Sequence, residues 1–167
     1  MSLRVIEGMI VGVSNPKITE IIIPQRIVHS IGPNAFADCK ELRSVIFQEP
    51  SGVRSIESGA FSGCESLCMI HLPDSIQMIW DNAFRGCINL TNVRFPSHLL
   101  FIGSSVFNAC KSLESIELPA SLVFIDKRVF YNCPQLKRAR IPRNVRVMAT
   151  QAEPEITVPS GARATYY

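Results

Sequence analysis

Apolar and polar residues alternate in short segments along the chain. In "LCMIHLP", residues 67–73, the apolar side chains of Ile70 and Leu72 flank the polar His71, and Pro73 follows. A period of two with β-branched or aromatic residues is typical of a half-buried β-strand, and a proline ends such a strand. Similar segments recur from residue 18 to residue 141. The pattern therefore predicts a series of short strands.

These segments belong to a longer repeat. Four of its units are 23 residues long, and the first carries two extra residues within "QEPSG". The shared pattern is I-x-x-x-(A/V)-F-x-x-C-x-x-L-x-x-(I/V/A)-x-(L/F/I)-P-x-x-(I/L/V). An incomplete unit precedes them in "KITEIIIPQRI", residues 17–27. The full units begin at Ile31, Ile56, Ile79, Ile102 and Ile125.

Such a period predicts stacked units that share one core, because a single unit cannot bury its own apolar faces. Strands joined by a crossover in one sheet are parallel, and parallel strands stack about 4.8 Å apart. The "(A/V)-F" pair of each unit lies on the return path. There we expect one helical turn to hold a phenylalanine inside the stack. These residues are Phe36, Phe61, Phe84, Phe107 and Phe130.

The string F-x-x-C-x-x-L-x-x-I-x-L-P-x-x-I-x-x-I, within residues 18–148, resembles the BspA-like, or Treponema-type, leucine-rich repeat. The resemblance implies an α/β repeat solenoid. This is a right-handed coil with a parallel β-sheet on its concave face and short strands or helical turns on its convex side. It also implies a secreted or surface-attached bacterial protein that acts in adhesion and protein binding.

We expect a single domain over residues 1–167. Residues 1–30 would form an N-terminal cap and partial repeat, and residues 31–148 would form five repeats of 23–25 residues. Residues 149–167 would form a C-terminal cap, because "EITVPSGARATYY" is similar to the strand, turn and tyrosines that close bacterial members of the family. A chain of this size buries a core without disulfide or metal staples.

Composition places the chain among globular proteins, with 47% hydrophobic and 19% charged residues. Its apolar runs are shorter than the roughly 18 residues of a membrane span. The N-terminal residues do not have the pattern of a secretory signal. The charge is uneven, because residues 125–148 hold seven of the 17 Lys and Arg residues and one of the 14 acidic residues. This basic end would attract an acidic partner or an anionic glycan.

The cysteines suggest chemistry at first sight, but five of the six fall in one column of the repeat. Stacking would place these Cα atoms about 5 Å apart with parallel Cβ vectors, which does not suit pairing across the column. We expect buried free thiols that donate weakly to loop carbonyls. Cys68 lies outside the column and is the thiol expected to react with an alkylating reagent. The column residues are Cys39, Cys64, Cys87, Cys110 and Cys133.

The three histidines, His29, His71 and His98, occupy different positions of the unit and belong to no catalytic or metal-binding motif. We therefore expect no enzyme, no metal site and no cofactor. Nucleic acid is not an expected partner, because the basic end lacks interleaved aromatic residues and a recognised motif.

A binding site would lie on the solvent side of the predicted strands, where residues alternate with the core positions. These positions change from repeat to repeat, from apolar at Ile22, Ile46 and Met69 to basic at the C-terminal end. We expect an extracellular or cell-surface module that binds a protein, such as a host matrix or serum protein, or an anionic glycan. The alternatives are a solvated face without a ligand and a structural stalk within a longer surface protein. The candidate residues are Met69, His71, Asn92, Arg94, Ser115, Glu117, Arg138 and Arg140.

Overall fold

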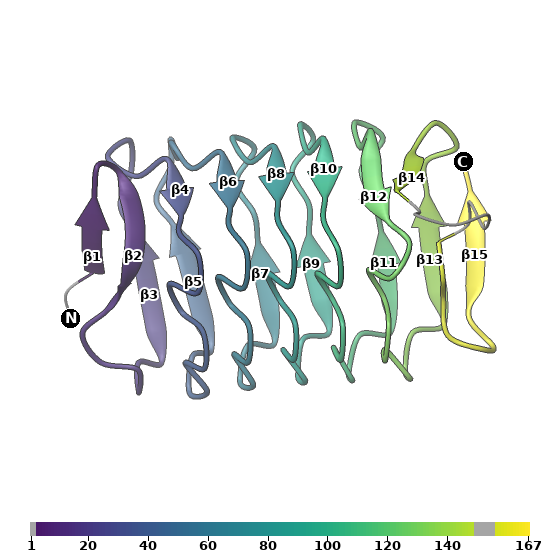
Figure 1. The fold of residues 1–167 in the computed structure, drawn as a ribbon, viewed down its shortest axis with the longest axis horizontal. Helices are drawn as coiled ribbons and strands as arrows, with labels where there is room; N and C mark the ends of the chain where they lie inside the picture. Colours follow the sequence, from purple (N-terminus) through teal and green to yellow (C-terminus); the bar gives the residue numbers. More distant parts are fainter. Residues whose placement is uncertain (1–2, 149–155) are drawn as a thin grey trace.

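The computed structural model describes residues 3–148 and 156–167 and shows a solenoid of stacked β-strands (Figure 1). The strands follow one another along its long axis, from β1 at one end to β15 at the other. One strand of each repeat lies on a surface that we call the odd-strand face. Its strands are β3 (Glu20–Ile23), β5 (Ser44–Phe47), β7 (Met69–His71), β9 (Asn92–Arg94), β11 (Ser115–Glu117), β13 (Arg138–Ile141) and β15 (Arg163–Tyr166).

A second sheet, the even-strand sheet, runs along the other side of the coil and includes eight strands of the described chain. Its parallel strands contain the opening isoleucines of the repeats, which pair in register and are buried. The strands are β1 (Leu3–Ile6), β2 (Met9–Val13), β4 (Ser30–Ile31), β6 (Ser55–Ile56), β8 (Met78–Ile79), β10 (Phe101–Ile102), β12 (Phe124–Asp126) and β14 (Arg146–Met148).

The strands of the odd-strand face form three hydrogen-bonded groups. β3 pairs with β5, β7 pairs with β9, and β11 pairs with β13, which pairs with β15. Within the described residues no ladder joins β5 to β7 or β9 to β11. Loops on one flank still connect the repeats across these breaks, because Ser66 N–H donates to the Lys40 carbonyl and Ser112 N–H donates to the Ile88 carbonyl. The face is thus interrupted twice while the coil remains continuous.

The interior contains the columns that the repeat predicts. The five phenylalanines are buried and stacked, with neighbouring ring centroids 5.1, 5.4, 5.8 and 6.1 Å apart. Their planes are inclined by 19°, 0°, 4° and 15° in the same order. Each ring packs on its equivalent in the next repeat, so the same residue suits every turn of the coil. The predicted phenylalanine stack is confirmed.

The predicted helical turn beside each phenylalanine is not found, and the described residues contain no helix. Backbone geometry explains this difference. In the third repeat Asn82 and Gly86, four residues apart, have φ angles of 57° and 72°. Left-handed residues interrupt a right-handed helix. The repeat solenoid is therefore confirmed, but the helical turns of the predicted α/β class are not.

The same segments form a ladder between repeats instead of a helix. The N–H groups of Asn34, Phe36 and Asp38 donate to carbonyls of Ser58, Ala60 and Ser62 in the next repeat. The intervening N–H groups close short turns within their own repeat, as when Ala37 N–H donates to the Asn34 carbonyl. Every second N–H thus points toward the neighbouring repeat in a segment whose left-handed residues lie four apart, and this pairing replaces the bonds that a helix would make.

Both ends of the described coil have added structure. At the N-terminus, β1 and β2 form an antiparallel hairpin whose turn residues, Glu7 and Gly8, have φ angles of 47° and 76°. Positive φ at both positions is typical of a tight two-residue hairpin turn. At the C-terminus, β15 adds in register to β13. Of the predicted C-terminal cap, residues 149–155 lie outside the described residues.

Candidate binding face

The odd-strand face brings the eight predicted site residues onto one surface. The register of the paired strands places them side by side in four pairs, each from two neighbouring strands, and all eight residues are exposed. Strand pairing therefore supports their geometric grouping, whereas their role in binding stays a prediction. The pairs are Met69 with Asn92, His71 with Arg94, Ser115 with Arg138, and Glu117 with Arg140.

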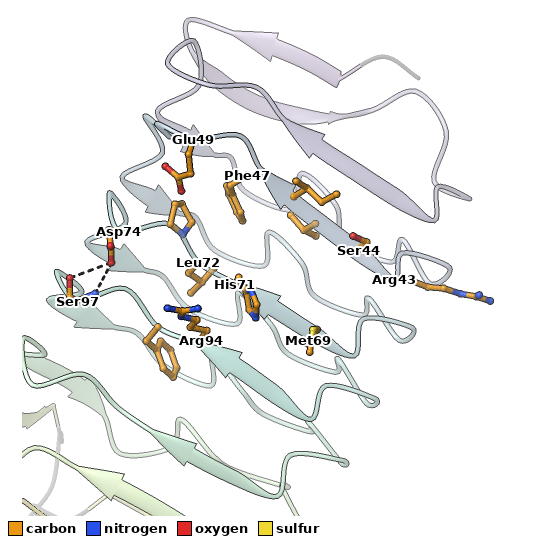
Figure 2. Close-up of a pocket in the computed structure, with 14 residues that line it drawn as sticks. Arg43, Ser44, Phe47, Glu49, Met69, His71, Leu72, Asp74, Arg94 and Ser97 are labelled. Atoms are coloured by element: carbon orange, nitrogen blue, oxygen red, sulfur yellow. Dashed lines mark hydrogen bonds between the residues drawn. The ribbon is translucent and has the colours of Figure 1, made fainter.

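The first break in the face, between β5 and β7, contains an open groove of about 690 Å³. We call it the apolar groove after two of its lining residues, Ile46 and Met69, whose large apolar side chains are exposed. Figure 2 shows Met69 and His71 on the same strand with Arg94 near them, while Arg43 extends away from the group. The side chains of Ile46 and Met69 are 43% and 53% exposed. Two neighbouring strands thus present large apolar side chains to solvent at one place.

Two aromatic side chains complete the apolar groove. Phe47 and Phe95 line it and are half-buried, although Leu118 occupies the same repeat position and is fully buried. Phe95 packs edge-on against the interior ring of Phe107, with centroids 5.9 Å apart and planes inclined by 84°. The repeat pattern assigns this position to the core. The sequence does carry a sign of this exposure, namely an aromatic residue at a repeat position where leucine also occurs. A phenylalanine ring is larger than the space that leucine fills, so part of it extends out of the core.

Charged and polar groups surround the apolar groove. Asp74 Oδ1 accepts hydrogen bonds from the Ser97 backbone N–H, at 3.1 Å, and from the Ser97 hydroxyl, at 3.3 Å. The backbone hydrogen bond from Ser97 is the main cause that lowers the pKa of the Asp74 carboxyl. The Ser97 hydroxyl and the nearby His98 and Arg94 side chains lower this pKa further. Glu49 also lines the groove. The apolar groove therefore combines exposed apolar side chains with acidic and basic groups, of which Asp74 is held in place by Ser97.

A second groove, of about 620 Å³, runs across the paired strands β11, β13 and β15 and reaches β9 beyond the second break, and we call it the arginine groove. Its lining includes Arg138, Arg140 and Arg163, together with Glu117. Glu117 Oε1 pairs with the Arg140 guanidinium at 2.9 Å. Arg163 belongs to the C-terminal tail and was not among the predicted site residues. Strand alternation continued through "ARATYY", residues 162–167, would have placed Arg163 on the solvent side of a strand, but not beside Arg138.

The C-terminal tail packs firmly against the arginine groove. The Arg140 guanidinium lies over the Tyr167 ring, 4.9 Å from its centroid. The Tyr167 hydroxyl donates to the Leu118 carbonyl, and the Tyr167 carbonyl accepts from the Arg143 N–H at 2.8 Å. These contacts keep Arg140 in place between Glu117 and the tyrosine.

The cysteine column has the predicted structural role. Thiols of the last four column residues donate to the carbonyl of the phenylalanine in the preceding repeat at 2.9–3.2 Å, as from Cys87 to Phe61. All five column thiols are free and buried, whereas Cys68 is exposed. Burial raises the pKa of the column thiols, to about 11 for Cys133. A thiolate nucleophile is disfavoured by such burial.

Two features of residues 3–148 and 156–167 bear on other functions. They contain no group of three or more histidine, cysteine, aspartate or glutamate residues placed to hold a metal ion. In the same ranges no helix has the length and apolarity needed to cross a membrane.

The repeat and its geometry match a known family. The family model described as "BspA type Leucine rich repeat region" matches residues 29–152 in six copies. The chain therefore belongs to the BspA-type leucine-rich repeat family. This family is typical of protein-interaction and surface proteins and is generally non-enzymatic. No curated protein matches the chain in sequence comparison.

Solved structures of similar bacterial proteins share the fold. A Treponema pallidum leucine-rich repeat protein is 30% identical with a TM-score of 0.74, and the match covers 83% of this chain and 72% of that one. For a Bacteroides ovatus leucine-rich repeat protein the identity is 31% and the TM-score 0.73, with 89% and 37% coverage. For a leucine-rich cell surface protein of Faecalibacterium prausnitzii they are 28% and 0.64, with 89% and 48% coverage.

Proposed function

We propose that this chain is a non-enzymatic module of a secreted or cell-surface protein and binds a protein ligand through the odd-strand face. The exposed apolar pair of Ile46 and Met69 in the apolar groove is the observation that carries the proposal. Scattered apolar residues are normal on a protein surface, but a group in a groove is typical of a recognition site. A host extracellular-matrix or serum protein is a ligand that suits a bacterial surface protein acting in adhesion.

The groups around the apolar groove support a specific contact with a polypeptide. Apolar side chains of a partner would pack between β5 and β7, and His71, Arg94 and Asp74 would pair with its polar groups. Interfaces of this kind combine an apolar centre with a polar rim. The cell-surface description of the Faecalibacterium prausnitzii protein supports an extracellular location for this chain.

Site-specific photocrosslinking tests the proposal even though the ligand is unidentified. A photoreactive residue replaces Met69 in one variant and Val123, an exposed residue beside the even-strand sheet, in the control. Both variants are exposed to blood serum and to an extracellular-matrix extract. We expect a discrete crosslinked protein at position 69 and none of it at position 123.

Binding of the captured protein is then measured with Met69→Ser and with Val123→Ser. Loss of one apolar anchor weakens binding about tenfold or more, because such residues dominate interface energy. Val123→Ser leaves the affinity within about twofold, as expected for a residue outside the contact. Equal capture at both positions, or equal affinity of both variants, contradicts a role of the apolar groove. Capture at neither position favours a structural stalk.

A further inference from the structure

The arginine groove contains positively charged side chains that do not stabilise the fold. Strand pairing sets Arg138 of β13 directly beside Arg163 of β15, and parallel neighbours lie about 4.8 Å apart. Like charges at adjacent positions of a sheet repel. Neither guanidinium has an ion-pair partner among the described residues, and both are exposed. We therefore expect this pair of cations to lower the stability of the free protein.

Arg140 contributes differently to the arginine groove. Its guanidinium is paired with Glu117 and stacked on Tyr167, so its position is set before any ligand arrives. Glu117 is the acidic residue of the lining and is engaged by this pair. The groove therefore keeps two uncompensated cations beside one fixed ion pair. Local arrangements that cost stability without helping the fold are typical of functional sites.

The other exposed residues that line the arginine groove have polar side chains. Asn92, Ser115 and Thr165 line it with hydrogen-bonding side chains, while its apolar lining residues Val93 and Ile116 are buried beneath them. The exposed apolar side chains that mark the apolar groove have no counterpart in this lining. A protein ligand normally requires such an apolar anchor. This composition favours a ligand rich in hydroxyl and anionic groups.

We propose that the arginine groove is a second binding site of the odd-strand face and takes an anionic polysaccharide. Guanidinium groups bind sulfate or carboxylate oxygens through paired, charge-assisted hydrogen bonds. Arg138 and Arg163 would bind such groups, and Asn92, Ser115 and Thr165 would face sugar hydroxyls. The site goes beyond the proposed protein-binding function, because it uses other side chains and a ligand of another class.

The test measures binding of dextran sulfate to the full chain, with neutral dextran as the uncharged control. The variant Arg138→Ser with Arg163→Ser is compared with Arg54→Ser plus Arg85→Ser, which removes the same charge from exposed positions outside the groove. We expect the first pair to weaken binding about tenfold or more and the second by less than about twofold. Added salt weakens binding of the parent chain by screening.

Several results overturn the assignment. If both double variants lose the same affinity for dextran sulfate, net charge alone explains the binding. If neutral dextran binds as well, the groove does not select anionic groups. Polyglutamate of equal charge serves as the acidic-peptide probe, and tighter binding of polyglutamate than of dextran sulfate assigns the groove to a protein ligand instead. The groove variant should also unfold at the same or a higher temperature without ligand, because a repulsive contact is gone. A lower unfolding temperature contradicts the repulsion from which we argue.

Met69→Ser separates this inference from the proposed function. The variant should keep the dextran sulfate affinity of the parent chain, since Met69 does not line the arginine groove. Loss of dextran sulfate binding in Met69→Ser contradicts two independent sites. Failure of protein capture at position 69 leaves the dextran sulfate result intact.

Discussion

The interior and the odd-strand face of the same repeats obey opposite rules. Inside, the phenylalanine column and the cysteine column keep one residue type through five turns of the coil. On the face, one equivalent position in four successive repeats is occupied by Met69, Asn92, Ser115 and Arg138. A residue inside touches its own equivalent, so only a side chain that packs on itself suits every repeat. A residue on the face meets solvent, so its identity is free to vary.

Truncation of an interior ring should produce the largest difference between these two regions. Phe84 lies between the rings of Phe61 and Phe107. Phe84→Ala should lower the free energy of unfolding by about 3–5 kcal/mol through lost burial and the cavity left behind. Met69→Ala should change it by less than about 0.5 kcal/mol. Urea unfolding of both variants measures this, and equal costs would remove the distinction between core and face.

Alkaline pH should weaken the interior through the cysteine column. The thiol pKa values are raised in the folded protein, so the folded state keeps protons that the unfolded state loses above the ordinary thiol pKa of 9.0. Stability is therefore fully present below about pH 9 and falls as pH rises through the folded values, by up to about 1.4 kcal/mol per pH unit for each such thiol. The fall for Cys133 ends near its folded pKa of about 11.

Urea unfolding between pH 8 and pH 10 in a reducing buffer checks this expectation. Cys87→Ala should make the free energy of unfolding fall less steeply with pH, because one of the contributing thiols is removed. Cys68→Ala, which removes an exposed thiol outside the column, is the matched control. An identical slope in Cys87→Ala and the parent chain would show that other groups cause the alkaline loss.

Two residues at one turn position allow a reciprocal exchange. Gly86 and Ala109 both precede the column cysteine and have φ angles of 72° and 60°. Gly86→Ala should cost about 1–2 kcal/mol, because a left-handed conformation strains a residue that has a Cβ atom. Ala109→Gly should relieve that strain and gain up to about 1 kcal/mol after the entropy of the unfolded glycine is subtracted. Thermal unfolding with opposite signs would support the turn ladder, and equal signs would contradict it.

The rim of the apolar groove should show the smallest effect. The pKa of Asp74 is lowered chiefly by the Ser97 backbone N–H. Its contribution to stability is present above its ordinary pKa of 3.8 and is lost as pH falls through the lower folded value. Ser97→Ala removes the hydroxyl contact alone and should raise the Asp74 pKa slightly. NMR titration of the Asp74 carboxyl measures the shift, and an ordinary pKa in the parent chain would contradict it.

The sequence predicted the parts of the fold that depend on contact between equivalent positions. The strand alternation of Ile70 and Leu72, the phenylalanine stack and the buried thiols could all be read from columns. The helical turn predicted beside each phenylalanine was not confirmed, because that prediction rested on the apolar pair and not on Asn82 and Gly86. Both residue types favour positive φ, and their spacing was a readable sign against a helix.

The candidate site was predicted in part. Alternation placed His71 beside Arg94 and Arg138 beside Arg140 on one surface. It did not place Phe95 at a groove, because the repeat pattern describes a column and not how far a ring extends from it. Arg163 was missed because the tail that carries it follows residues that have no repeat pattern.

The sequence alone determined that this protein is a repeat coil, which residues fill it and which columns face solvent. These features are periodic, and packing of a side chain on its own equivalent requires only that the period be kept. Tertiary structure decided where the odd-strand face breaks, which side chains share each groove and that Arg163 lies beside Arg138. Those features arise between different residues distant in the chain, so only the packed coil brings them together.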